Sequence, residues 1–346
     1  MARRACMAAL MALVAVGCAD DLRKAPSDDG RYDVPPEQRE VEEPVHFVQR
    51  TPGVAYNLPR PGQPGIADLI ALLPDRVLEA DEADTFMAPG EDLQCNNGKV
   101  TELDGLPMTL EAIVTLHPRQ YLKVPICDQD ERNYGAYTIE DDTGGIVVLR
   151  NSRVAWFTAG DRVRLTVRGL MYTFRSPTTR VVLVADVERL DPPSADAAHT
   201  VLYDRLTAPF DIDDITEIRR VEGVIIQSPT NANFGTMRVA SKAIPDVEDD
   251  GSADPVCTAN CRGRCRPLCG DICEGRVCPA VCAGGVPFEA DALPVCWSIN
   301  IDAELGRRGF SPPEGARVAV TGPVFESFDM EMWVQRLGQI EVLDGN

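Results

Sequence analysis

TLEAIVTLHP at residues 109–118 has a diverged copy further along the chain, RVEGVIIQSP at residues 220–229. Three more pairs follow in the same order: YGAYTIED (134–141) with FGTMRVAS (234–241), GDRVRLTVRGLMYTF (160–174) with GARVAVTGPVFESF (315–328), and ADVERLD (185–191) with GQIEVLD (338–344). Because a repeat in fixed order indicates duplicated structural units, the sequence predicts two tandem domains of one fold.

Each copy reads as short strands separated by turns. In the first copy the predicted strands are residues 110–116, 134–140, 146–150, 162–174 and 180–190. Residues 162–174 alternate apolar and polar side chains, which is typical of a half-buried strand. The DDTGG stretch at residues 141–145 and the RSPT stretch at 175–178 are predicted turns. Five strands in so short a segment favour an all-β fold, with each copy closed into a small barrel so that no edge is exposed.

The hairpin YTIEDDTGGIVV (137–148) followed by GDRVRLTVRG (160–169) resembles the OB-fold modules of exported bacterial proteins, including those attached to extracellular nucleases. The resemblance covers residues 105–192 and, in pieces, residues 215–346. It implies two five-stranded Greek-key barrels. Nuclease activity is not implied, since no nuclease domain follows.

The first 18 residues, MARRACMAALMALVAVGC, have a basic start and a short apolar core. The core is too short to span a bilayer, so residues 1–17 are predicted to be a cleaved signal peptide. The AVGC ending resembles the lipobox of bacterial lipoproteins, in which the cysteine, here Cys18, is acylated. A lipid anchor at the envelope of a Gram-negative bacterium is therefore expected, at the outer membrane facing the periplasm or at the cell surface. The alternative is an ordinary secretory signal.

The remaining segments divide by composition. Residues 18–64 are rich in Pro and acidic residues and are predicted to be a disordered tether. Residues 65–104 are expected to form a short helix, with apolar spacing over 66–80 that Pro74 interrupts, followed by an irregular segment. Residues 193–214 are predicted to be a linker, and residues 242–295 a cysteine-rich insertion in the second barrel, in place of the 141–145 turn.

Ten cysteines remain after Cys6 and Cys18 are set aside, and an even number in an exported chain predicts disulfides. These residues are Cys95, Cys127, Cys257, Cys261, Cys265, Cys269, Cys273, Cys278, Cys282 and Cys296. Spacing suggests a Cys95–Cys127 pair, while the pairing of the other eight stays open. A metal or iron–sulfur site is the alternative, but the continuous C-x3-C spacing does not form two zinc knuckles.

No metal site or cofactor is predicted. Asp246, Glu248, Asp250 and Gly251 have the spacing of the first ligands of a calcium loop, but Cys257 replaces the Glu expected at its twelfth position. The stretch 246–254 is therefore interpreted as a solvated acidic loop. The three histidines are scattered, and no nucleophile elbow, phosphate loop or zincin motif occurs.

One surface of the first barrel is a candidate binding site, because OB-folds often bind oligonucleotides or oligosaccharides beside their last hairpin. A basic stripe ending in aromatic residues is expected there, provided that no bulge at Gly169 shifts the register. It consists of Arg162, Arg164, Arg168, Tyr172, Phe174, Arg175 and Arg180. The alternative is a solvated face paired with local acids. The net charge of −20 disfavours non-specific polyanion binding by the chain as a whole. Residues 105–192, with 11 acidic and 11 basic residues, are the exception.

Together these features predict a lipoprotein that is not an enzyme and that binds a protein or glycan partner at the membrane. Binding of single-stranded nucleic acid or another polyanion by the first barrel is the alternative. An enzyme whose site assembles from distant residues is a third hypothesis.

Overall fold

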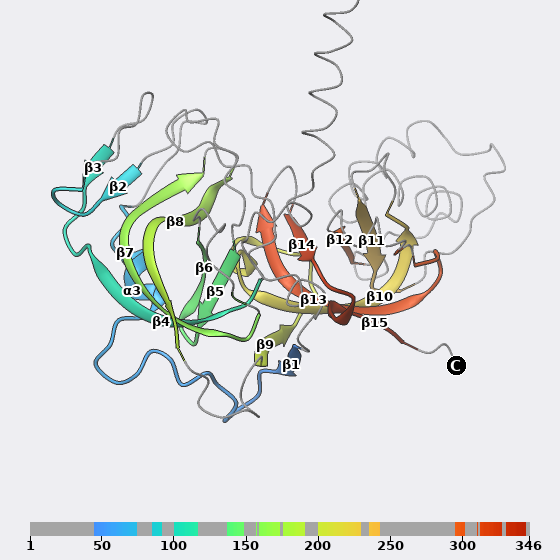
Figure 1. The fold of residues 1–346 in the computed structure, drawn as a ribbon. Helices are drawn as coiled ribbons and strands as arrows, with labels where there is room; N and C mark the ends of the chain where they lie inside the picture. The colour runs from blue at the N-terminus through green and yellow to red at the C-terminus, as the bar shows by residue number, and fades with distance from the viewer. Residues whose placement is uncertain are drawn as a thin grey trace, which may run out of the picture.

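The described part of the chain is built mainly from β-strands that close into two five-stranded barrels (Figure 1). It comprises residues 45–74, 85–91, 100–116, 137–148, 157, 159–173, 176–190, 200–229, 235–242, 295–301, 310, 312–326 and 330–343 of this computed structural model. The prediction of a mainly β protein with two closed barrels is confirmed.

The first barrel contains one strand for each strand predicted in the first copy. These are β4 (Met108–Val114), β5 (Tyr137–Asp141), β6 (Gly144–Val148), β7 (Arg162–Thr173) and β8 (Ser176–Arg189). Neighbours pair in the order β7-β4-β5-β6-β8, and β8 pairs back onto β7 to close the barrel. All of these pairs are antiparallel except β6–β8, which is parallel. Two short strands, β2 (Thr85–Met87) and β3 (Val100–Glu102), extend the sheet beside the distal half of β7.

The second barrel repeats this topology. Its strands are β10 (Ile218–Gln227), β11 (Thr236–Ala240), β12 (Cys296–Ile301), β13 (Arg317–Glu326) and β14 (Met330–Val334). Their order is β10-β11-β12-β14-β13, with β13 closing onto β10, and β12–β14 is the parallel pair. The duplicated sequence therefore forms duplicated structure.

The last strand differs between the copies. Strand β8 is continuous, whereas its counterpart is split into β14 and β15 (Ile340–Val342) by the one-turn 3₁₀ helix η5 (Leu337–Gln339). The buried side-chain amide of Gln339 forms hydrogen bonds with backbone groups at this break in the strand. Its Oε1 accepts from the amides of Gln335 and Arg336, and its Nε2 donates to the carbonyls of Thr321 and Trp333. One side chain thus satisfies backbone groups that a continuous ladder would have paired.

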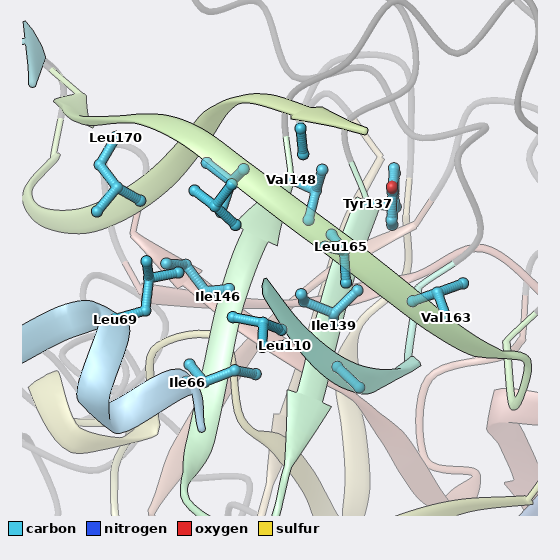
Figure 2. Close-up of a cluster of buried hydrophobic side chains, with 14 of the residues drawn as sticks. Ile66, Leu69, Leu110, Tyr137, Ile139, Ile146, Val148, Val163, Leu165 and Leu170 are labelled. Carbon is cyan, nitrogen blue, oxygen red and sulfur yellow. The ribbon is translucent and has the colours of Figure 1, made fainter. Parts of the chain in front are cut away.

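The core of the first barrel follows from the alternation along β7. Val163, Leu165 and Val167 point inward and are fully buried, as predicted. Figure 2 shows Val163 and Leu165 in the cluster with Leu110 of β4, Ile139 of β5 and Ile146 of β6, while helix α3 (Ile66–Ala71) contributes Ile66 and Leu69.

The hairpin tip of β5–β6 holds the start of helix α3. The Asp141 carboxylate accepts from the amide of Ile66, and the Thr143 hydroxyl accepts from the amide of Ala67. Helix α3 lies in the 66–80 segment where a short helix was predicted, and it ends at Ala71. The chain leaves the helix before Pro74, since proline disfavours helical geometry in the residue before it.

Two segments predicted to lack regular structure contain strands instead. Strand β1 (His46–Gln49), from the predicted tether, pairs in parallel with β9 (Thr200–Arg205), from the predicted linker. Strand β9 in turn pairs with β10. The prediction was wrong for residues 46–49 and 200–205, because composition does not show which segments pair with distant strands.

The insertion leaves the second barrel at a hairpin tip. Strands β11 and β12 pair from Thr236↔Asn300 to Ala240↔Cys296, and the Ser241 hydroxyl accepts from the amide of Val295. Residues 243–294 lie outside the described residues, as do the acidic loop 246–254 and every cysteine except Cys296. Cys296 is disulfide-bonded, and the stapling of the insertion stays a prediction. Residues 1–44, including Cys18, also lie outside.

Candidate functional sites

The outward side of β7 carries three arginines of the predicted basic stripe, here termed the arginine face: Arg162, Arg164 and Arg168. The carboxylate of Glu111, on β4, is buried between two of them. It accepts from Arg162 Nε at 3.1 Å and from Arg164 at 2.9 Å. Burial raises the pKa of Glu111, but the hydrogen bonds from Arg164 and Arg162 outweigh burial and hold it below 4.5. The carboxylate is thus ionised at neutral pH and offsets the charge of the face.

The other acids beside the arginine face lie on neighbouring elements. Arg164 also pairs with Glu188 at 3.0 Å. Arg168 lies between Glu91 at 2.8 Å and Asp186 at 3.3 Å. The hydrogen bond to Glu111 raises the pKa of Arg164, and the hydrogen bonds to Glu91 and Asp186 raise the pKa of Arg168. The three guanidinium groups therefore already have anionic partners, which is the alternative left open by the sequence.

The aromatic end of the stripe is not assembled as predicted. Register shifts at Gly169 turn the following residues over, so Tyr172 joins the core instead of following Arg168 on the outside. Its hydroxyl donates to the carbonyl of Pro74, and its ring meets Phe86 edge-on at 6.5 Å. An extra residue in one strand reverses its facing in this way. Arg180 is exposed on β8, while Phe174 and Arg175 lie outside the described residues.

The bulge requires a glycine at position 169 because the side chain of Met87 packs directly against its backbone. A Cβ at Gly169 would lie 2.5 Å from the sulfur of Met87 on β2. The glycine therefore lets β2 join the sheet where β7 changes register.

A second polar cluster, which the sequence did not predict, lies where the barrels meet and is here called the junction. Arg50, just after β1, donates to Glu140 of the first barrel at 2.8 Å. It also lies 3.6 Å from Asp204 of β9, which Arg219 of β10 contacts at 3.2 Å. One arginine from the predicted tether thus connects strands of both sheets.

Tyr56 completes the junction. Its hydroxyl donates to Glu140 at 3.3 Å and accepts from the amide of Leu202 at 2.8 Å. Its own amide donates to Asp142 at the β5–β6 turn. Burial and the adjacent Glu140 raise the pKa of Tyr56 well above 10, so its hydroxyl stays protonated.

Glu140 is almost completely buried. Burial and the neighbouring Glu217 of the second barrel raise the pKa of Glu140 well above 4.5, against the opposing effect of Arg50. The junction thus places a buried carboxyl group between a second acid and an arginine.

Apolar contacts extend the junction. Met87, Leu116, Val147, Met171, Val181 and Leu183 of the first barrel form one buried cluster with Phe325 and Trp333 of the second. The two aromatic rings are 4.4 Å apart. A Cβ at Gly145 would lie 2.6 Å from the carbonyl oxygen of Thr216, so the backbones of the two barrels touch there. The barrels are packed together rather than joined by a free linker.

The sequence carried a weak signal for the junction. Glu140 lies at a strand position that the alternation assigned to the outside, and its copy in the second barrel is Ala240. A glutamate in one copy and an alanine in the other indicates that Glu140 has a role that the second barrel does not share. Its partners Arg50 and Tyr56 could not be identified in the same way, because they lie far away in the chain in a segment with the composition of a tether.

Within the described residues, no group of three or more His, Cys, Asp or Glu side chains is arranged to hold a metal ion. The same residues contain no helix that is long and apolar enough to cross a membrane.

Comparisons with known proteins give little further information. No protein-family model matches the chain, and no curated protein is significantly similar to it. Among solved structures, a deletion mutant of the single-stranded DNA-binding protein from Thermus aquaticus matches at 9% identity with a TM-score of 0.17. The match covers 69% of this chain and 95% of the other. A TM-score of 0.17 is too low to indicate a shared fold.

Proposed function

We propose that this protein is a membrane-tethered lipoprotein whose two OB-like barrels form a non-catalytic binding scaffold at the bacterial cell envelope. The partner is a protein or a glycan. The lipobox-like AVGC at residues 15–18 supports the tether. The shared barrel topology, with a single parallel pair in each five-stranded barrel, supports the OB-like assignment.

The junction is the observation that carries the scaffold proposal. It packs the two barrels together through Arg50, Tyr56, Glu140 and a buried apolar cluster. A molecule that holds two recognition modules in one arrangement presents a preorganised surface, so less ordering entropy is lost when a partner binds.

The pairing of the arginine face supports a protein or glycan partner over a polyanion. A nucleic acid binds tightly when cationic side chains of the protein displace the counterions around its phosphates. The guanidinium groups of the arginine face are already paired with acidic side chains of the protein. Binding of single-stranded nucleic acid by the first barrel stays the alternative prediction.

Metabolic labelling with palmitate in a Gram-negative host tests the tether. The full chain is expected to take up label and to fractionate with membranes. The Cys18→Ala variant is expected to be unlabelled and soluble. Persistence of that variant in the membrane fraction would contradict the anchor at Cys18.

Photo-crosslinking in the same cells tests the partner class. Crosslinkers replace the exposed Leu337 and Val342 beside the second barrel. Adducts that protease or glycosidase digestion shortens support the proposal. Adducts shortened by nuclease instead support the nucleic-acid alternative, and the absence of adducts at both positions contradicts the scaffold role of this surface.

A further inference from the structure

A cavity of about 480 Å³ opens on the second barrel, where β9 ends and β10 meets β13. Its size lies within the range of small-molecule sites. The lining residues that matter for recognition are Arg205, Glu222, Gly223, Lys242, Trp297 and Arg317.

The cavity has an excess of positive charge in a strongly acidic chain. Glu222 is the acid of the lining, and it is paired with Arg205 at 2.7 Å. Lys242 and Arg317 are exposed and make no ion pair with other described residues. Two cations therefore line the cavity without an ion pair to any described carboxylate, since Glu222 is paired with Arg205 and Arg220 instead.

Comparison of the two barrels shows how the cavity arose. In the first barrel Glu111 lies opposite Arg164, and Ile113 lies opposite Arg162. Both arginines bond to Glu111 and cover this part of the surface.

In the second barrel the equivalent acid, Glu222, lies opposite Ala319, and Val224 lies opposite Arg317. The alanine removes one guanidinium group. Because Arg205 and Arg220 hold Glu222, Arg317 is left free to face the opening. The same register thus gives a closed ion-pair cluster in one copy and an open cationic cavity in the other.

The floor of the cavity is apolar, and Thr207 and Ser241 add polar groups to the lining. Trp297 is almost fully buried beneath the cavity, and its indole Nε1 donates to the carbonyl of Ala208 at 2.8 Å. The half-buried side chains of Leu206 and Val224 offer the hydrocarbon surface to a ligand.

We propose that this cavity binds a small organic anion, with its carboxylate, phosphate or sulfonate group held by Arg317 and Lys242 and its apolar body placed against Leu206 and Val224. Charge-assisted hydrogen bonds fix the anionic group. This inference does not depend on the proposed membrane tether or on the partner of the scaffold.

Fluorescence titration with 8-anilinonaphthalene-1-sulfonate tests the site, with the uncharged N-phenyl-1-naphthylamine as the matched probe. The intact protein is expected to bind the sulfonate at one site, and benzoate, but not benzyl alcohol, is expected to displace it. Arg317→Ala combined with Lys242→Ala is expected to weaken sulfonate binding about tenfold or more. Binding of the uncharged probe should change less than about threefold, since its contacts are apolar.

Three controls make the result specific. Arg180→Ala removes an equally exposed cation from the first barrel and is expected to leave sulfonate binding unchanged. Arg317→Lys keeps the charge and is expected to retain most of the affinity. Unchanged thermal unfolding of the double variant shows that the fold is intact, as expected for two exposed side chains. Equal losses for both probes, an unchanged sulfonate affinity in the double variant, or no saturable binding to the intact protein would each overturn the proposal.

Discussion

Replacing Arg50 with alanine tests the electrostatics of the junction. The Arg50 guanidinium lies 2.8 Å from Glu140 and is partly buried with it. Alanine leaves the carboxyl of Glu140 buried beside Glu217 without its cation. Removing one partner of a buried pair costs about 3–5 kcal/mol, so Arg50→Ala is expected to lose up to that much stability at pH 8, and less to the extent that Glu140 keeps its proton.

The loss is expected to shrink as the pH falls. The folded pKa of Glu140 is raised above its unfolded value, so its contribution to stability is complete below pH 4.5 and is lost as the pH rises toward the folded pKa. Removing Arg50 raises that pKa further. In the folded variant, Glu140 can avoid a buried charge by keeping its proton. Keeping it lowers the free energy of unfolding by about 1.4 kcal/mol for each pH unit above the unfolded pKa of the carboxyl group. The cost is therefore bounded at about 5 kcal/mol at pH 8 and falls below about 2 kcal/mol at pH 5.

Urea unfolding at pH 5, 6.5 and 8 measures these differences by tryptophan fluorescence, to which Trp333 of the junction and Trp297 of the second barrel both contribute. Arg205→Ala is the control, because Arg205 and Glu222 form a more exposed pair that is worth about 1 kcal/mol or less at every pH. Adding Glu140→Gln to Arg50→Ala is expected to restore most of the stability at pH 8. The same cost for Arg50→Ala at pH 5 and pH 8, or no rescue by the glutamine, would refute the reasoning.

Three further predictions follow from packing and charge. Gly145→Ala is expected to cost about 1–3 kcal/mol by forcing the barrels apart at Thr216, while Gly338→Ala, with nothing within 4 Å of the added carbon, is expected to be close to neutral in the same urea assay. Gln339→Ala removes four hydrogen bonds and is expected to cost about 2–4 kcal/mol, measured by chemical unfolding. Fluorescence anisotropy with labelled oligothymidylate is expected to show no binding at low salt, because the arginine face is internally paired. Salt-sensitive binding that Arg164→Ala abolishes would reverse that expectation.

The barrels were predictable because the information for them is local and repeated. The alternation of Val163, Leu165 and Val167 defines the inner face of β7 without knowledge of any distant residue. The duplicated segments then show independently that the pattern belongs to a complete unit. The position of the insertion follows from the same comparison, since β11 and β12 remain paired on either side of it.

The junction could not be predicted because its residues become informative only in three dimensions. Arg50 lies among prolines and acids, and its role depends on pairing between β1 and β9 that no short-range pattern encodes. Tyr172 shows a related limit. Alternation placed it outside, and the register shift at Gly169 placed it inside, so the bulge removed Tyr172 from the predicted binding surface.

The charge balance of the first copy has a different meaning in the structure from the one it has in the sequence. A neutral segment in an acidic chain suggested a surface prepared for an anionic ligand. In the structure the arginine face is held by Glu111, Glu188, Glu91 and Asp186, so neutrality reflects internal pairing. In the second copy Ala319 has replaced one arginine, and Arg317 no longer pairs with the equivalent acid. The more acidic copy is therefore the one with cations available, because recognition depends on charges that the fold has left unpaired rather than on net charge.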